Sequence, residues 1–275
     1  MHYDIRDARL YYETTGEGKP IVMLHGFGCD HRLMQGCMEP IFNHPANRNY
    51  KRYYLDLPGM GKSTAPRSCA SADAVLKILV AFMQDIVPDG FLLAGQSYGG
   101  YLARGVAARL SEHMDGLLLI CPVAIPTHDQ RAVPVKNACR SDETFLRTLS
   151  EKEREEFCSY AVVADNRTFL RYKEEISSSF KLADATFLAT LRNNYTFSFI
   201  PEETLGAKPF HKPSLILTGR QDVCVGYQNQ WKLMEAYSRA TFATLDMAGH
   251  NLQLDAPRLF DVLVEDWLRR TETQD

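Results

Sequence analysis

Short, largely apolar runs recur along the chain. They lie at 21–24, 52–55, 91–94, 116–121, 214–218 and 241–245. Runs of this length that are apolar throughout, such as Ile21-Val22-Met23-Leu24, predict strands buried on both faces, as in a parallel sheet. Residues 2–15 alternate loosely and end in a turn containing Gly16 and Gly18, which predicts an antiparallel pair of strands ahead of the first buried one.

Apolar residues at helical spacing separate these runs. In 71–87 they share one helical face, which is formed by Val75, Leu79, Phe82, Met83 and Ile86. Further helices are expected up to Phe42, over 100–110, over 228–238 and after Asp255, which would cap the closing helix with Pro257 in its first turn. Strands that alternate with helices predict an α/β fold with a mostly parallel, doubly wound sheet.

The alternation stops between residues 125 and 208. This segment is polar, charged and aromatic, and it contains no strong buried strand. Its charged run 151–156 predicts an exposed helix face. Apolar residues at helical spacing follow, namely Phe169, Tyr172, Ile176 and Phe180. We therefore expect a helical cap over 125–208, inserted into a core made of 1–124 and 209–275.

Composition narrows the set of partners. The chain has 275 residues and a formal net charge of −3, so neither nucleic acid nor an acidic membrane surface is an expected partner. It has no run of about 18 apolar residues and no apolar signal-peptide segment after Met1. The seven cysteines form no C-x-x-C, which favours reduced thiols over a disulfide framework or a zinc site. We expect a cytoplasmic protein with a small-molecule substrate, and a homodimer stays open.

The stretch Gly95-Gln96-Ser97-Tyr98-Gly99 joins an apolar run to a helical stretch. A strand, G-x-S-x-G and a helix form the context of a nucleophile elbow, a tight turn that directs the serine hydroxyl out of the sheet. Glycine is required two residues to either side, because a side chain there would crowd the turn. The helix start after Ser97 also offers free N–H groups to a developing negative charge. Ser97 is therefore a candidate nucleophile.

A second glycine-rich stretch invites a different interpretation. Gly61-Lys62-Ser63 looks like the end of a phosphate-binding loop, but such a loop needs glycine five residues before Gly61, where this chain has Asp56. Pro58 also suits a turn better than a phosphate cradle. We therefore expect no nucleotide here and no cofactor elsewhere.

Two further polar residues follow predicted strands. Asp222 comes after 214–218 and His250 after 241–245, at the sheet edge where sites form in open parallel sheets. A serine hydroxyl is a poor nucleophile until a base such as histidine takes its proton. An aspartate can hold that imidazole in the required tautomer and stabilise its cation. The sequence has no H-E-x-x-H or similar ligand spacing, so no metal site is expected.

These features together resemble the α/β-hydrolase superfamily of serine hydrolases with a cap. The resemblance covers nearly the whole chain outside the cap, and it rests on the order Ser, Asp, His and on His25-Gly26-Phe27-Gly28, Asp56-x-Pro58-Gly59-x-Gly61-x-Ser63, Gly95-Gln96-Ser97-Tyr98-Gly99-Gly100, Gly219-Arg220-Gln221-Asp222 and Gly249-His250-Asn251. It implies that Asp222 is the acid, because Asp246 and Asp255 lie too close to His250 for the family pattern.

The resemblance also implies roles around the serine. The backbone N–H groups of Phe27 and Tyr98 would form the oxyanion hole, and His25 would support that loop without catalysing. The rings of Phe27 and Tyr98 are expected to line the pocket. Candidates for its wall from the cap are aromatic, namely Tyr195, Phe197 and Phe199.

We expect a serine hydrolase that acts on a small ester or related acyl compound through an acyl-enzyme. Serine at the elbow argues against the dehalogenases and epoxide hydrolases of this fold, which use aspartate. A carbon–carbon bond hydrolase stays open, and a buried cap arginine facing Ser97 would favour it, with Arg167, Arg171 and Arg192 as candidates. A ligand receptor of the same fold, with the triad retained and very slow turnover, also stays open.

Overall fold

The computed structural model of the protein describes residues 1–135, 139–206 and 208–273. An eight-stranded sheet has the order β1-β2-β4-β3-β5-β6-β9-β10. Its strands are β1 (His2–Ile5), β2 (Ala8–Thr15), β3 (Lys19–Leu24), β4 (Tyr50–Leu55), β5 (Phe91–Gln96), β6 (Met114–Ile120), β9 (Ser214–Gly219) and β10 (Ala240–Leu245). β2 runs antiparallel to β1 and β4, whereas the other neighbouring pairs are parallel. The predicted strands and fold class are confirmed.

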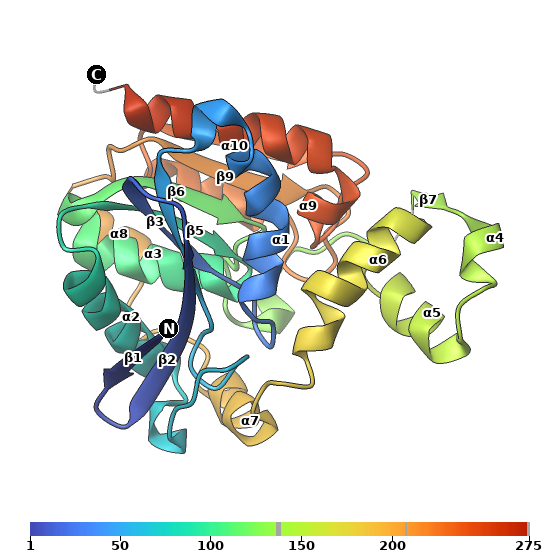
Figure 1. Ribbon diagram of the computed structural model, residues 1–275, viewed down its shortest axis with the longest axis horizontal. Helices are drawn as coiled ribbons and strands as arrows, with labels where there is room; N and C mark the ends of the chain where they lie inside the picture. Colours follow the sequence, from blue (N-terminus) through green and yellow to red (C-terminus); the bar gives the residue numbers. More distant parts are fainter. Residues whose placement is uncertain (136–138, 207, 274–275) are drawn as a thin grey trace.

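Helices cover both faces of this sheet (Figure 1). α1 (His31–Phe42) packs beside α10 (Pro257–Glu272) on one face, and α2 (Ala72–Ile86) packs beside α3 (Tyr98–Leu110) on the other. α2 begins where the Ser71 side chain accepts a hydrogen bond from the Ala74 N–H, and it buries most of the stripe that the sequence predicts. The strands between these layers are apolar because both of their faces are covered.

Two predictions in the last quarter of the chain are wrong in detail. Residues 228–238 form a 3₁₀ helix over Asn229–Glu235, held by the buried Gln230 side chain, which donates to the carbonyls of Pro122 and Val225. Asp255 ends α9 (Leu252–Asp255) and does not cap α10, whose N-cap is Ala256. The Asp255 carboxylate instead accepts hydrogen bonds from the backbone N–H groups of Val163 and Gly249.

The segment between β6 and β9 is mainly helical. It contains α4 (Glu143–Leu146), α5 (Glu151–Cys158), α6 (Asn166–Glu175), α7 (Ala185–Asn193) and α8 (Pro201–Leu205), and a two-stranded sheet of β7 (Arg140–Ser141) and β8 (Val163–Ala164). Figure 1 shows α4, α5 and β7 far from the main sheet, whereas α8 packs against α3. Residues 136–138 and 207 of the predicted cap lie outside the described residues. Its boundaries at 125 and 208 stay a prediction.

Details of this segment match its sequence. The charged run lies on α5, which Ser150 and Glu153 begin with a capping box. α6 buries Phe169 and Tyr172 and ends before Phe180, which is 46% exposed. Among the described helices, none combines the length and the apolar character that crossing a membrane requires.

Candidate active site

Ser97 occupies the turn between β5 and α3, with φ 54° and ψ −113°. This positive φ is unfavourable for a residue with a side chain, and such strain is typical of functional turns. A Cβ on Gly95 would collide with the Gly99 carbonyl, and one on Gly99 would collide with the Leu24 carbonyl. The two glycines therefore permit the close approach of strand and helix that holds Ser97 in this turn.

Ser97, His250 and Asp222 form one hydrogen-bonded line. His250 Nε2 lies 2.9 Å from Ser97 Oγ, and His250 Nδ1 lies 2.9 Å from Asp222 Oδ2. Since a carboxylate can only accept, Nδ1 carries the proton and Nε2 is left to accept the serine proton. The three residues follow β5, β9 and β10, so the carboxyl ends of parallel strands bring them to one edge.

Asp222 is fully buried and held by its own loop. Its Oδ1 accepts hydrogen bonds from the N–H groups of Cys224 at 2.8 Å and Val225 at 3.0 Å. Burial alone would raise the pKa of Asp222, but the charge and hydrogen bond of His250, together with these N–H groups, outweigh it and hold the pKa below its usual value. Asp222 is therefore an anion fixed in place beside the imidazole.

Two backbone N–H groups beside Ser97 are unoccupied. In the described part of the chain, no hydrogen bond engages the N–H of Phe27 or of Tyr98. Tyr98 is the first residue of α3, where the helix leaves its N–H groups without internal partners. A Cβ on Gly26 would collide with the Gln96 side chain and lie 3.4 Å from Ser97 Cβ, so the loop before Phe27 approaches the serine closely.

His25 supports that loop from behind. Its Nε2 accepts a hydrogen bond of 2.9 Å from the Leu57 N–H, so Nδ1 carries the proton and donates to the Gly26 carbonyl at 2.7 Å. Burial lowers the pKa of His25 and outweighs the opposing charge of Asp56, which keeps the ring neutral. This arrangement fits the supporting role that the family resemblance implies.

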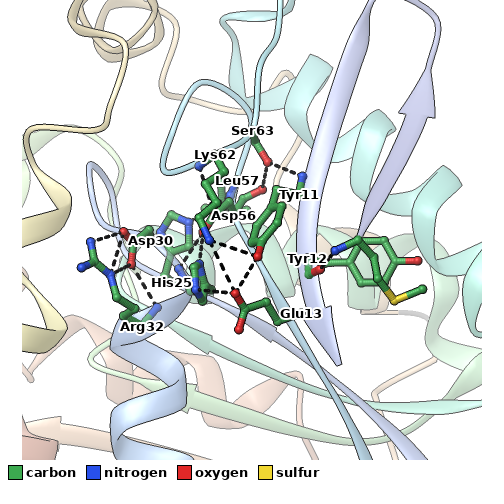
Figure 2. A network of polar contacts seen from close by, with 12 residues as sticks. Tyr11, Tyr12, Glu13, His25, Asp30, Arg32, Asp56, Leu57, Lys62 and Ser63 are labelled. Carbon is green, nitrogen blue, oxygen red and sulfur yellow. Dashed lines mark hydrogen bonds and ion pairs between the residues drawn. The ribbon is translucent and has the colours of Figure 1, made fainter. Parts of the chain in front are cut away.

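A polar network centred on Asp56 continues behind His25 (Figure 2). Asp56 accepts hydrogen bonds from the backbone N–H groups of His31 and Lys62, both at 2.7 Å, and its carbonyl accepts from Ser63 Oγ at 2.6 Å. Gly61 has φ 57°, and a Cβ there would collide with the Asp56 carboxylate. The glycine-rich stretch is thus folded around an aspartate, an arrangement that serves a turn rather than a phosphate.

A cavity of about 600 Å³ opens beside Ser97 and His250. Of the aromatic residues expected in its wall, Phe27 and Tyr195 line it. Phe197 instead stacks on Tyr101 with a centroid separation of 4.3 Å. The Tyr98 ring is fully buried behind Phe27, at 5.8 Å between centroids, so the expectation that it lines the pocket is wrong.

The three arginines that the sequence offers as cap candidates differ in whether they line this cavity. Arg192 lines the cavity. Arg171 pairs with Glu175 at 2.5 Å, and Arg167 donates to the Leu254 carbonyl at 3.4 Å, and neither lines the cavity. The sequence interpretation missed Arg131, which does line it, because nothing in the local pattern around this residue signals a pocket.

Two groups of described residues bring three potential metal ligands within 4.8 Å of one another. They are Cys121, Asp222 and His250, and Asp30, His31 and Asp56. In both groups these side chains already bond to protein atoms, His250 to Asp222 and Ser97, and His31 to Asp56 at 2.8 Å. These bonds do not test whether either group binds a metal, so the expectation of no metal site stays a prediction.

Comparisons with known proteins agree with this fold. A crystal structure of an alpha/beta superfamily hydrolase from Oenococcus oeni PSU-1 matches with a TM-score of 0.88 and 32% identity, over 99% of this chain and 100% of that one. A meta-cleavage product hydrolase matches with a TM-score of 0.69 and 20% identity, over 98% and 97%, which shows a shared fold.

Curated relatives include an (E)-2-((N-methylformamido)methylene)succinate hydrolase from Acinetobacter baylyi, 25% identical over 272 residues, which are 95% of this chain and 94% of that protein. A pimeloyl-[acyl-carrier protein] methyl ester esterase from Nitrosomonas europaea is 30% identical over 115 residues, which are 41% of each protein. That match spans less than half of the esterase.

A family model described as the alpha/beta hydrolase fold matches residues 19–257, which include the serine turn, Asp222 and His250. This range covers most of the chain. The chain therefore belongs to the alpha/beta hydrolase fold family.

Proposed function

We propose that this alpha/beta hydrolase is a serine hydrolase that cleaves a small ester or related acyl compound. The observation that carries the proposal is the line Asp222–His250–Ser97, with 2.9 Å at each step. A buried carboxylate, an imidazole in the matching tautomer and a serine on a strained turn are the parts required to activate a hydroxyl. The esterases among its relatives support the same reaction class.

In the first step Ser97 Oγ attacks the acyl carbon and its proton moves to His250 Nε2. Asp222 stabilises the resulting imidazolium. The negative charge that develops on the acyl oxygen is bound by the N–H groups of Phe27 and Tyr98, which have no other partner in the described residues. His250 then returns the proton to the leaving alcohol as the ester C–O bond breaks, and the acyl group stays on Ser97.

The second step repeats this chemistry with water. His250 takes a proton from a water molecule, whose oxygen attacks the acyl carbon of the acyl-enzyme. The bond to Ser97 Oγ breaks, the serine recovers its proton, and the carboxylic acid is released. Every proton transfer in the cycle uses side chains that are already in place.

The cavity supports a small substrate enclosed by a cap. Its lining combines Ser97 and His250 from the core with residues of the segment 125–208, among them Tyr160, Tyr172 and Phe180. We propose that this segment covers Ser97 and opens to admit substrate. A cavity of about 600 Å³ suits short or compact acyl groups better than long lipid chains.

A carbon–carbon bond hydrolase is the second candidate. Arg192, one of the three cap arginines that would favour it, lines the cavity that contains Ser97. Arg192 is exposed, however, whereas a carbon–carbon bond hydrolase is favoured by a buried arginine that faces Ser97. Ester hydrolysis therefore remains the better supported activity.

A substrate panel separates these reactions. Purified protein should be assayed with 4-nitrophenyl esters of increasing acyl length and with a vinylogous diketone. We expect steady turnover of the short esters, a decline as the chain lengthens, and loss of turnover in Ser97→Ala. Cleavage of the diketone alone would support the second candidate. Release of a single equivalent of nitrophenol without further turnover would indicate a receptor.

A further inference from the structure

The cavity beside Ser97 has an unbalanced charge. Two arginines, Arg131 and Arg192, are among its lining residues, whereas no aspartate or glutamate of the described chain lines it. The remaining lining is apolar, aromatic or uncharged polar, apart from the imidazole groups. The wall is largely apolar and Arg131 is partly buried in it, so water screens a charge there less than on an open surface.

Arg131 is held at the cavity by neutral partners. Its guanidinium donates to the carbonyls of Ile125 at 2.8 Å, Cys224 at 3.0 Å and Pro126 at 3.0 Å. These bonds fix the position of the side chain but leave its positive charge without a counter-ion. A guanidinium has five N–H donors, so three carbonyls do not exhaust its capacity.

Three other arginines that are at least partly buried lie beside carboxylates. Arg52 pairs with Glu39 at 3.0 Å, Arg104 with Glu202 at 2.6 Å and Arg171 with Glu175 at 2.5 Å. Each of these guanidinium groups therefore has a carboxylate beside it. Within the described residues, neither Arg131 nor Arg192 has a carboxylate at ion-pairing distance. The cavity thus holds two arginines whose charge no carboxylate of the described chain balances.

Arg192 leaves its donors available. It lies in α7, and its guanidinium carbon stands 5.5 Å from the centre of the Phe27 ring, whose backbone N–H belongs to the proposed oxyanion hole. A ring contact orients the planar group without using its N–H donors. The fork of two parallel N–H groups on an arginine matches the two oxygens of a carboxylate.

We propose that the acyl compound cleaved at Ser97 carries a carboxylate in addition to its scissile bond, bound by Arg192 with Arg131 adding a fixed positive charge. This inference rests on the proposed hydrolase function and specifies its substrate class. The substrate itself supplies the negative charge that the cavity lacks. A neutral ester of the same length would leave both guanidinium groups unpaired.

Two matched substrates test this inference. The 4-nitrophenyl monoester of glutaric acid and 4-nitrophenyl valerate have acyl chains of equal carbon number and differ in the terminal carboxylate. We expect kcat/KM to be at least about tenfold higher for the glutarate, the scale of one charge-assisted hydrogen bond. In Arg192→Gln this preference should fall by about tenfold, mainly through KM, and Arg192→Lys should restore part of it.

Arg220→Gln is the matched control, because its guanidinium lies over the Tyr227 ring at 4.5 Å and does not line the cavity. It should keep the preference of the wild type. Equal kcat/KM for the two esters, or a preference unchanged in Arg192→Gln, would overturn the inference.

Failure of the proposed function gives a different result, since neither ester would then be hydrolysed. Calorimetry with glutarate would still decide the inference in that case. Binding to the wild type that weakens in Arg192→Gln would support it, and no binding, or equal binding to both proteins, would overturn it.

Discussion

The carboxylate of Asp255 accepts a hydrogen bond of 2.9 Å from the backbone N–H of Gly249, the residue that precedes His250. Its other oxygen accepts from the Val163 N–H in β8 at 3.1 Å. Asp255 thus joins the histidine loop to the segment between β6 and β9. Its side chain is 8% exposed, and burial raises the pKa of this carboxyl to about 6, against the partial compensation of the backbone N–H groups.

The first prediction is that the raised pKa of Asp255 makes the stability of the protein depend on pH. Its pKa is higher in the folded protein than in the unfolded chain, so the folded state holds the proton more tightly. Its contribution to the free energy of unfolding is full below about pH 4 and is lost as pH rises to about 6, a change of about 3 kcal/mol. Asp255→Asn removes this titration. As pH rises from 4 to 6, the free energy of unfolding of the variant should therefore increase by about 3 kcal/mol relative to that of the wild type.

Urea unfolding of both proteins at several values between pH 4 and pH 7 measures this shift. Asp89→Asn, at an exposed surface carboxylate, is the control and should show a difference that is constant with pH. A constant difference for Asp255→Asn as well would show that this carboxyl does not titrate in the expected window.

The second prediction concerns the acid beside His250. Asp222→Asn removes the charge that stabilises the imidazolium and disturbs the tautomer, so kcat should fall by about 10³–10⁴-fold. Asp246→Asn is a matched control, because Asp246 also follows a sheet strand but its carboxylate accepts from Gln221 at 2.9 Å. It should change kcat by less than about twofold. Activity of Asp222→Asn within about threefold of wild type would mean that another acid serves His250.

Much of this site could be predicted from the sequence because its signals are local. Ser97 directly follows its strand, Asp222 and His250 lie in the loops that follow theirs, and a parallel sheet brings the ends of its strands to one edge. The glycines around Ser97 are also a local signal, because the crowding that requires them arises within a single turn. Short-range pattern and fold geometry together were sufficient for these residues.

Other features depend on contacts that no local pattern announces. Asp255 was expected to cap a helix, but its carboxylate bonds to residues 6 and 92 positions away. Arg131 was missed for the same reason, since Cys224, one of its partners, is 93 residues distant. The Tyr98 ring was expected at the pocket, but its direction is set by packing against Phe27 and Tyr195.

The third prediction concerns the boundaries of the cap. The part of the segment 125–208 that carries α4 and α5 has few buried residues and exposes several basic side chains, among them Arg147, Lys152 and Arg154. Brief tryptic digestion should therefore cut first between residues 139 and 181, while the sheet stays intact. Peptide mapping by mass spectrometry locates the cuts. First cuts within 1–124 would contradict the proposed division.

The central claim is that Ser97 is the activated nucleophile of a hydrolase that turns over. The most direct measurement is titration with a fluorophosphonate, in which label on each peptide and hydrolysis of a short aryl ester are followed together. We predict one equivalent of label, located on Ser97, and a loss of hydrolysis in proportion to it. Label elsewhere, hydrolysis that persists when Ser97 is fully labelled, or no labelling of the folded protein would contradict the account.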